Sequence, residues 1–372
     1  AWGHLRGTQP PPTGGGSVMI PLRIKDIAER LGVSAATVSR ALNDKPGVSF
    51  DMRRQVLELA AAVAFTPHGV GRGLSTARTQ TLGFIVRRKG FPASRDPFYW
   101  QIMHGVEEAA AQRGYHVILS SVGDPDGTRP QPDLSLVREN RVDGLILAGP
   151  DIDRSLIVEL ALADVPLVLI DNSLRQTPLD VVLSDDREGA RAVVAHLLGH
   201  GHRRVAFIGG PAGWISSAER AAGYAEALAH ADLSGPATLV HEAETTVASG
   251  YAATCRLLAE DAPPTALFAV NDSMAIGALR ALREQGRRVP EDVAVAGFDD
   301  IEAAQHTHPP LTTARIYKER LGQVAANRLL DRLADPASPP QRTYVGTELI
   351  IRQSCGCVPD PVWEEVTAGN DV

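Results

Sequence analysis

The sequence LRIKDIAERLGVSAATVSRALN, residues 22–43, has the pattern of two short helices joined by a turn. Apolar residues within 24–31 repeat at the spacing of one helical face. Gly32 then supplies the backbone freedom that ends a helix, and Ser34 is placed to cap a second helix over residues 35–42. The segment therefore predicts two helices meeting at a glycine turn.

A third amphipathic helix is expected from about Ser49 to Ala64, and it would brace the first two as a helix-turn-helix. The second helix is short enough to enter a DNA major groove with its N-terminal residues leading. Its hydroxyls can bind phosphate oxygens, and its arginine can form paired hydrogen bonds with guanine. The positions predicted to face DNA are Ser34, Ala35, Ala36, Thr37, Ser39 and Arg40.

Length and charge indicate a DNA-binding piece attached to a larger body. At 372 residues the chain exceeds one small core, so two or three folding units are expected. Its net charge of −7 is uneven: residues 1–80 carry +5 and the rest −12. Only the first piece is therefore suited to a polyanion. This charge split alone is also compatible with an ordinary solvated surface.

The composition indicates a protein of the cytoplasm. Residues 1–20 are rich in glycine and proline, lack the apolar core of a secretory signal, and are expected to be a disordered extension. No apolar run approaches the roughly 18 residues that cross a bilayer, so no membrane partner is expected. The three cysteines fit unpaired thiols better than a four-ligand zinc site.

After Thr79 apolar strands alternate with amphipathic helices, which predicts parallel sheets covered by helices on both faces. The pattern has too many units for one sheet, so two similar subdomains with a ligand cleft between them are expected. The predicted strands are 81–86, 117–119, 144–147, 167–170, 205–208, 266–269 and 293–296. The predicted helices are 101–113, 156–162, 189–198, 218–229 and 273–285.

Hydrogen-bonding side chains follow several of these strands, and two aromatic residues follow the first. Carboxylate, amide and guanidinium groups that meet in a cleft suit a polyhydroxyl ligand, and aromatic faces can cover a sugar ring. Each residue also has a structural alternative, as a helix cap or a core side chain. The candidate effector-binding residues are Phe98, Tyr99, Asp171, Ser216, Arg220, Asn271, Asp272 and Asp299.

Enzyme motifs are missing from the sequence. The stretch IGGPAG at 208–213 is neither a dinucleotide-binding GxGxxG nor a phosphate loop ending in GK[ST]. No HExxH, GxSxG or zinc-deaminase pattern occurs. The sequence therefore predicts neither catalysis nor a cofactor or metal.

The segment DIAERLGVSAATVSRALNDKPGVS at 26–49, with Arg53 and Phe65-Thr66-Pro67, closely resembles the headpiece of the lactose-repressor (LacI/GalR) family. The resemblance continues from about Leu22 to Gly356. It implies an all-α helix-turn-helix headpiece and an α/β, two-lobed sensor like a periplasmic binding protein, with parallel sheets joined by three crossovers. It also implies a hinge helix whose Leu74 wedges into the DNA minor groove.

The resemblance divides the chain into five parts. These are the extension at 1–20, the helix-turn-helix at 21–66, the hinge at 67–79, the sensor at 80–358 and a tail at 359–372. Within the sensor, the N-lobe is expected at about 80–183 and 316–343, and the C-lobe at about 184–315 and 344–358.

Family motifs support several of the candidate effector contacts. The segment from Gly209 to Tyr224 is similar to the one whose arginine and serine hold the effector, which here are Arg220 and Ser216. VNDSMAIGALRAL indicates Asn271 or Asp272, AGFDD indicates Asp299, and LIDN indicates Asp171. The stretch at 87–95 is longer and more basic than is usual in the family, which would suit an anionic group on the ligand.

The resemblance predicts a homodimer that binds a pseudo-palindromic operator and whose affinity for DNA is controlled by a small effector, a sugar in most relatives. A regulator that senses a nucleobase or a phosphorylated metabolite as corepressor shares the architecture and remains an alternative. A third alternative is a solute-binding protein with no DNA role. Inducer and corepressor action are both compatible with the sequence.

Overall fold

The computed structural model describes residues 24–42, 45–62, 78–87, 97–122, 135–174, 177–233 and 238–356. The chain divides into two compact units, residues 1–78 and 79–372. The predicted N-terminal extension, most of the hinge and the tail lie outside the described residues.

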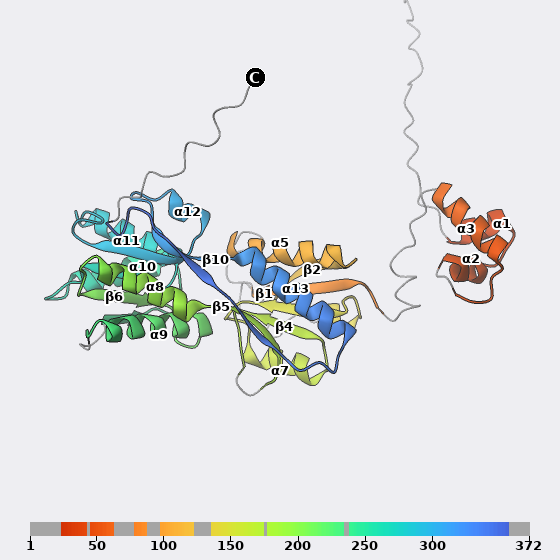
Figure 1. Cartoon of the computed structure of the whole chain (residues 1–372), viewed down its shortest axis with the longest axis horizontal. Helices are drawn as coiled ribbons and strands as arrows, with labels where there is room; N and C mark the ends of the chain where they lie inside the picture. The colour runs from red at the N-terminus through yellow and green to blue at the C-terminus, as the bar shows by residue number, and fades with distance from the viewer. Residues whose placement is uncertain are drawn as a thin grey trace, which may run out of the picture. The chain divides into compact units, whose positions relative to one another are not determined.

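The first unit contains the three predicted helices (Figure 1): α1 (Ile24–Leu31), α2 (Ala35–Leu42) and α3 (Phe50–Ala62). Gly32 adopts a φ of 63°, the left-handed conformation that glycine tolerates best. The Ser34 hydroxyl accepts a hydrogen bond of 3.1 Å from the backbone N–H of Thr37, which confirms the predicted cap of α2. The buried core of this unit is formed by Ile27, Ala28, Val38, Ala41, Val56 and Ala60.

The N-lobe of the second unit is built on a six-stranded sheet in the order β11-β5-β4-β3-β1-β2, with every pair parallel. Its strands are β1 (Thr81–Arg87), β2 (His116–Val122), β3 (Gly144–Ala148), β4 (Leu167–Ile170), β5 (Asp180–Ser184) and β11 (Arg342–Val345). Its helices are α5 (Pro97–Gln112), α6 (Ser135–Arg138), α7 (Arg154–Leu162) and α13 (Lys318–Ala334). Gly144 faces Leu329 of α13, whereas the next residue, Leu145, packs in the cluster that includes Leu156 of α7. The two helices therefore cover opposite faces of the sheet.

The C-lobe repeats this plan with strands in the order β12-β10-β9-β8-β6-β7. Its strands are β6 (Val205–Gly209), β7 (Thr238–His241), β8 (Ala266–Ala269), β9 (Ala294–Asp299), β10 (Thr312–Ile316) and β12 (Thr347–Ile350). Its helices are α8 (Asp186–Gly199), α9 (Ile215–His230), α10 (Val247–Leu258), α11 (Asp272–Glu284) and α12 (Glu302–Gln305). β12 pairs antiparallel with β10, which is the exception to the predicted parallel arrangement.

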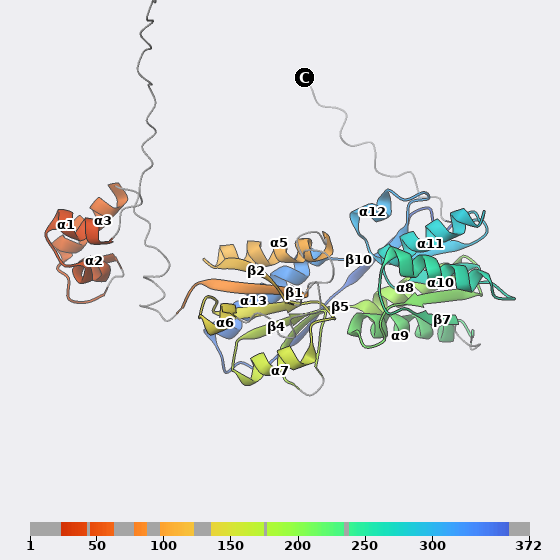
Figure 2. The same ribbon diagram turned by 180° about the vertical axis from the view of Figure 1, so that it is seen from behind.

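The chain crosses between the lobes three times, as predicted, and each crossing is a single residue. Asp185 joins β5 to α8, Tyr317 joins β10 to α13, and Gly346 joins β11 to β12. The backbone N–H of Asp185 donates to the carbonyl of Val345 over 2.8 Å, so two of the crossings lie side by side. Both views show the lobes joined next to β5 and β10 (Figure 1, Figure 2).

Helices α5 and α13 approach each other at two glycines. A Cβ added to Gly105 would lie 2.0 Å from the carbonyl oxygen of Glu319, and one on Gly322 would lie 2.0 Å from that of Ile102. Only glycine fits such backbone contacts. The packing fixes the first turn of α13 beside α5, at the edge of the N-lobe that faces the C-lobe.

Several elements differ from the sequence-based expectation. Helix α2 and strands β4 and β8 have the predicted bounds. The elements that were not predicted are β5, β7, β10, β11, β12, α6, α10, α12 and α13. α5 begins at Pro97 rather than near Gln101, so Phe98 and Tyr99 lie within its first turn rather than before it. Among the described helices, none is long and apolar enough to cross a membrane.

Candidate functional site

Helix α2 presents part of the predicted DNA-facing set at the surface of the headpiece. Ala36 and Arg40 are exposed, and the Arg40 Nε donates to the carbonyl of Ala36 over 3.3 Å. Thr37 is half-buried, and its hydroxyl lies 2.9 Å from that of Ser34. Ala35 is also half-buried because it packs against the headpiece core.

The side chain of Ser39 and all of Leu74 lie outside the described part of the chain. The roles assigned to them therefore stay predictions.

Arg220 is the central residue of a polar cluster between the two lobes. It is buried on α9, and its Nε donates to Asp186 over 2.8 Å while Nη1 donates to the carbonyl of Val270 over 2.5 Å. Nη1 also lies 3.1 Å from Asp299 Oδ1. The guanidinium carbon is 3.8 Å from the ring centroid of Phe298, a cation–π contact. One C-lobe side chain thus links the ends of three C-lobe elements.

The carboxyl groups of Asp171, Asp186 and Asp299 surround this arginine, and Asp272 lies close to Asp299. The pKa of each of the four is above its usual value. Burial raises the pKa of Asp299 to about 6 and that of Asp272 to about 8. Burial also raises the pKa of Asp186 and, to a greater extent, that of Asp171. Burial by itself would lower the pKa of Arg220, but the neighbouring carboxylates reverse this effect and raise it. The cluster is therefore acidic and largely removed from water.

The backbone at two of these carboxylates is strained. Asp171 has a φ of 53°, and the adjacent residues Asp299 and Asp300 have φ values of 104° and 49°. Left-handed backbone at residues other than glycine gathers at ligand sites when neighbouring contacts hold it in place. Here the ammonium of Lys318 donates to the carbonyls of Asp299 and Asp300. Lys318 begins α13 of the N-lobe, so a residue of one lobe fixes a turn of the other.

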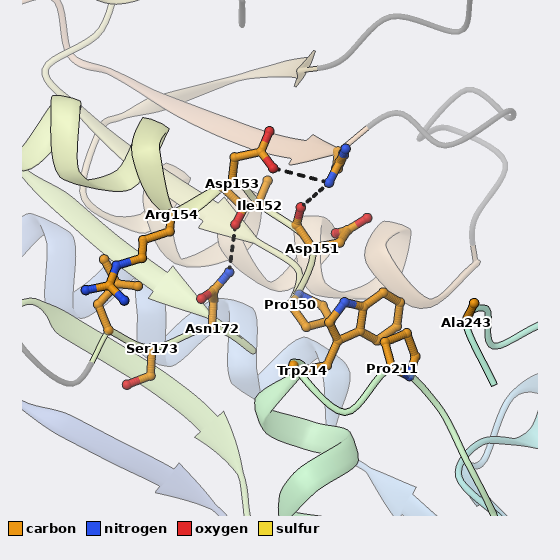
Figure 3. Close-up of a pocket in the computed structure, with 13 residues that line it drawn as sticks. Pro150, Asp151, Ile152, Asp153, Arg154, Asn172, Ser173, Pro211, Trp214 and Ala243 are labelled. Atoms are coloured by element: carbon orange, nitrogen blue, oxygen red, sulfur yellow. Dashed lines mark hydrogen bonds and ion pairs between the residues drawn. The ribbon is translucent and has the colours of Figure 1, made fainter. Parts of the chain in front are cut away.

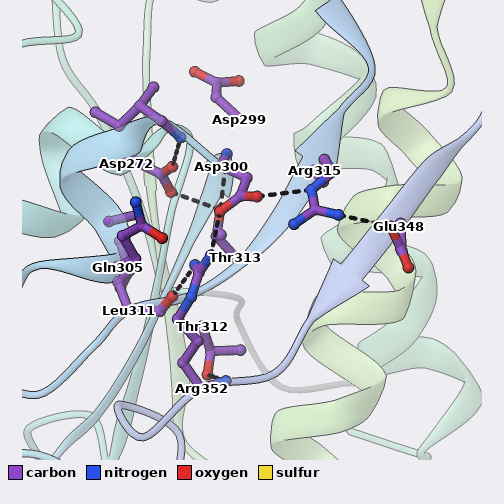
Figure 4. A network of polar contacts seen from close by, with 12 residues as sticks. Asp272, Asp299, Asp300, Gln305, Leu311, Thr312, Thr313, Arg315, Glu348 and Arg352 are labelled. Atoms are coloured by element: carbon purple, nitrogen blue, oxygen red, sulfur yellow. Dashed lines mark hydrogen bonds and ion pairs between the residues drawn. The ribbon is translucent and has the colours of Figure 1, made fainter. Parts of the chain in front are cut away.

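A second network holds the turn at Asp300 (Figure 4). Its carboxylate accepts hydrogen bonds from Arg315 over 2.8 Å and from Arg352 over 2.7 Å. The carboxylate of the neighbouring Asp272 accepts from the Thr313 hydroxyl over 2.6 Å and from the backbone N–H of Ile301 over 2.8 Å. Both oxygens of Asp272 are therefore occupied by protein groups.

Asp171 differs from Asp272 because its buried Oδ1 atom accepts no hydrogen bond from any residue that the structure describes. The Ser216 hydroxyl lies near this carboxyl group and lowers its pKa, against the larger effect of burial. Asp299 Oδ1 also meets no hydrogen-bond donor at good geometry among the described residues, but it is paired with Arg220 Nη1 at 3.1 Å. A buried acceptor without a donor costs about 1–3 kcal/mol. Asp171 Oδ1 is therefore the best acceptor for a ligand donor.

The remaining predicted effector residues have structural contacts as well. The Asn271 side chain caps α11 by accepting from the backbone N–H of Met274 over 3.0 Å. The Phe98 ring is half-buried and lies 5.7 Å from the Lys318 ammonium. Tyr99 packs edge-on against Phe98, with ring centroids 5.2 Å apart. The structure thus brings Asp171, Ser216, Arg220 and Asp299 together, with Asp272, Phe98 and Lys318 at one side.

A cavity of about 490 Å³ opens beside this cluster and is lined by both lobes (Figure 3). The N-lobe contributes Arg87 at the end of β1, the loop after β3 and the residues after β4. The C-lobe contributes the loop that leads into α9, including Trp214. The cleft that the sequence predicted between two subdomains is therefore present in the structure.

Sequence reasoning missed three residues of this region: Asp186, Lys318 and Trp214. Asp186 and Lys318 each begin a helix immediately after a crossing between the lobes. Trp214 is the residue before α9. Trp214 lies within the segment from Gly209 to Tyr224 that the sequence had already singled out, so that segment was the available signal.

Within the described residues, no three histidine, cysteine or acidic side chains are grouped so as to hold a metal ion. The Cys255 thiol is free, and the sulfur of the buried Cys355 lies 3.3 Å from the His196 ring and accepts a hydrogen bond from the Thr312 hydroxyl over 3.1 Å.

Two family models match the chain. The model of bacterial regulatory proteins of the lacI family matches residues 23–68, and that of the periplasmic binding protein-like domain matches residues 194–355. These are the headpiece and most of the C-lobe with its neighbouring N-lobe elements.

Curated relatives match over nearly their whole length. The HTH-type transcriptional repressor PurR of Mannheimia succiniciproducens is 31% identical, covering 89% of this chain and 98% of the relative. The ribose operon repressor of Haemophilus influenzae is also 31% identical over 89% of this chain and 98% of its own. These relatives are transcriptional repressors rather than enzymes, in agreement with the sequence-based prediction.

Solved structures match equally well. The lac repressor dimer bound to operator and the anti-inducer ONPF is 30% identical, with 90% of this chain and 99% of that chain covered and a TM-score of 0.74. The transcriptional regulator CelR–cellobiose complex is 32% identical, with the same coverage and a TM-score of 0.69. With its helix-turn-helix headpiece and two-lobed sensor, this chain belongs to the LacI family and is a DNA-binding transcriptional repressor.

Proposed function

We propose that the effector of this repressor is a neutral polyhydroxyl molecule, a sugar, bound between the two lobes. The observation that carries the proposal is a pair of carboxyl groups on facing lobes: Asp171, whose buried Oδ1 accepts no hydrogen bond from the described residues, and Asp299, whose Oδ1 pairs with Arg220 at 3.1 Å. A sugar hydroxyl can donate to each while accepting from a neighbouring group. Because Asp171 belongs to the N-lobe and Asp299 to the C-lobe, one ligand would connect the lobes.

Charge also favours a neutral ligand. In the described part of the cluster, Asp171, Asp186, Asp272 and Asp299 outnumber the cations Arg220 and Lys318. Both cations are already bonded to carboxylates or carbonyls. An anionic ligand would therefore add negative charge, in a site of low dielectric, beside four carboxyl groups and two cations that are already bonded. Two of the similar proteins, the ribose operon repressor and the regulator in the CelR–cellobiose complex, are named with a sugar, which agrees with this proposal.

A phosphorylated metabolite or nucleobase is the second candidate. Arg87 lines the cavity, and the basic residues that follow it in the sequence lie outside the described part of the chain. An anion held by Arg87 would lie in the same cleft.

For DNA, we propose a homodimer that places two headpieces on a pseudo-palindromic operator in the cytoplasm, with Leu74 of each hinge in the minor groove. Effector binding would favour one closure of the lobes and thereby change how the hinges are held. It can shift this equilibrium only by its differential affinity for the two states.

Two measurements test this function. Thermal-shift screening should find a neutral sugar that raises the melting temperature by mass action. The same sugar should change binding to a duplex selected from a random pool. Stabilisation only by phosphorylated compounds or nucleobases would favour the second candidate.

The DNA contact has its own test. Arg40→Ala should cost about 1–3 kcal/mol at one base position and relax specificity there. An equal loss on every sequence would instead make Arg40 a phosphate contact.

A further inference from the structure

The cavity between the lobes adjoins the polar cluster on both sides of the cleft. On the N-lobe side, Asp171 belongs to the cluster and the next residue, Asn172, lines the cavity. On the C-lobe side, Ser216 bonds Asp171, and Trp214, two residues earlier, lines the cavity. The cluster and the cavity therefore share two segments of the chain, the residues after β4 and the start of α9.

The cavity has the lining of a sugar-binding subsite. Apolar surface comes from the Trp214 indole, which extends toward Pro150 and Asp151 of the opposite lobe (Figure 3). Hydrogen-bonding groups surround it. The Asn172 amide nitrogen donates to the Gly149 carbonyl over 3.0 Å. The side-chain oxygen of Asn172 can therefore accept a hydrogen bond from a ligand. An aromatic face beside polar groups matches the apolar and polar sides of a pyranose ring.

Charge in the cavity is balanced, which disfavours a phosphate or carboxylate. The lining includes two arginines and two aspartates. The Arg87 Nη1 atom donates to the Asp151 carbonyl over 2.7 Å and lies 3.4 Å from the Asp153 carboxylate. Its charge is therefore already compensated. The volume of about 490 Å³ is within the range of small-molecule sites and leaves room for a ring beyond the one in the cluster.

We propose that the cavity is a subsite for a second sugar ring, so that the effector is a disaccharide or longer glycoside rather than a monosaccharide. The first ring binds Asp171, Asp299 and Arg220, and the second stacks on Trp214. This inference rests on the proposed function, a sugar between the lobes. The inference adds that the ligand has at least two rings and that Trp214 selects for this length.

The test compares one-ring and two-ring sugars by calorimetry. D-glucose, D-galactose and D-ribose are measured against cellobiose, maltose and lactose on the full chain. At least one disaccharide should bind about tenfold or more tighter than its component monosaccharides, because only it reaches Trp214. Trp214→Ala should remove that advantage and leave monosaccharide binding within about twofold.

Two further variants separate this effect from a general loss of structure. Trp100 is exposed on α5, so Trp100→Ala removes an indole outside the cleft and should change neither class of sugar. Gly213 lines the cavity, and a Cβ there would meet no atom within 4 Å. Gly213→Leu should therefore fold normally and exclude disaccharides while still admitting monosaccharides.

The outcomes distinguish this inference from the proposed function. If monosaccharides bind as tightly as disaccharides, and Trp214→Ala and Gly213→Leu affect both alike, the second subsite is wrong while the sugar cleft stands. If no sugar of the panel binds, the sugar proposal itself fails and the second subsite fails with it.

Discussion

The two lobes share one fold but differ in how their facing edges are held. At the C-lobe edge, Arg220 bonds Asp186 and the Val270 carbonyl and pairs with Asp299. Both oxygens of Asp272 are likewise occupied. At the N-lobe edge, the half-buried Asp171 keeps an oxygen without a donor among the described residues. The C-lobe edge is thus rigidly preformed, and the N-lobe edge is only partly satisfied.

This difference suggests an order of events. A ligand would first bind the preformed C-lobe groups, whose orientation costs no further ordering. The N-lobe would then gain hydrogen bonds at Asp171 as the lobes close. The free energy that drives closure would come from the N-lobe edge, at Asp171. The stability of the fold depends instead on the C-lobe edge.

Arg220→Ala should have the largest effect, because it leaves Asp186 and Asp299 buried without their counter-charge. We expect a loss of about 3–5 kcal/mol in the free energy of unfolding of the sensor, together with loss of the effector response. Urea unfolding measures the first and operator release the second. The control is Arg187→Ala, which breaks surface pairs with Glu219 and Glu226. It should cost less than about 1 kcal/mol. Equal losses in the two variants would contradict a C-lobe edge held by Arg220.

Lys318→Met tests an N-lobe group that supports the C-lobe edge. It removes the donor to two carbonyls in a strained turn, and we expect a loss of about 2 kcal/mol in the free energy of unfolding. Arg320→Met, an exposed change on the same helix, is the control. A Lys318 variant as stable as this control would show that the turn is held from within the C-lobe alone.

Asp171→Asn should separate binding from stability. The change removes a buried charge whose pKa is raised by burial, so the free energy of unfolding should stay within about 1 kcal/mol of the parent. Effector affinity should fall about 10- to 100-fold, because a hydrogen bond to a charged acceptor is weakened. Asp164 has the same φ of 53° and is exposed after α7, so Asp164→Asn is the matched control. A stability loss as large as that of Arg220→Ala would remove the distinction between the two edges.

The pH dependence of stability should show a smaller effect. Asp299 and Asp272 have folded pKa values of about 6 and 8, above their usual value of 3.8. At a pH between 3.8 and these raised values, the folded sensor holds more protons than the unfolded chain. Its free energy of unfolding should therefore fall as the pH rises from about 4.5 to 8. His202, whose pKa is lowered by burial, opposes this trend weakly.

Denaturation in urea across this pH range measures the slope. Asp299→Asn should flatten it. Asp300→Asn should not, because hydrogen bonds from Arg315 and Arg352 outweigh burial and lower the pKa of Asp300. A parent protein that gains stability over the same range would contradict the raised pKa values.

Much of the fold was predictable because its signals are local. Helix α2 follows from a glycine turn and a serine cap, and β8 from a short apolar run. Helix α13 and strand β5 were missed for a shared reason. Arg328 is buried on α13, where it pairs with the buried Asp180 at the start of β5 over 2.7 Å. An ion pair inside the core interrupts the apolar pattern of both elements, so neither reads as a buried segment.

The same missed elements limited how much of the candidate site could be predicted. Asp171 and Asp299 were predictable because the parallel strands of each sheet place their last residues at one edge, where a ligand cleft is expected. Asp186 begins the helix that follows β5, and Lys318 begins α13. Because β5 and α13 were not predicted, neither residue was recognised as part of the site. Nor does the sequence indicate which carboxylates are already satisfied, since that depends on partners such as Thr313, 41 residues away from Asp272.

The single-residue crossings at Asp185, Tyr317 and Gly346 limit how this sensor can move. Connections this short cannot lengthen, so the lobes cannot slide past each other or separate. A relative displacement must come from torsion at these positions, as a rotation about an axis through the connecting strands. A small angular change there would become a larger linear displacement at the far end of the N-lobe, where β1 begins and the chain leads back to the headpiece.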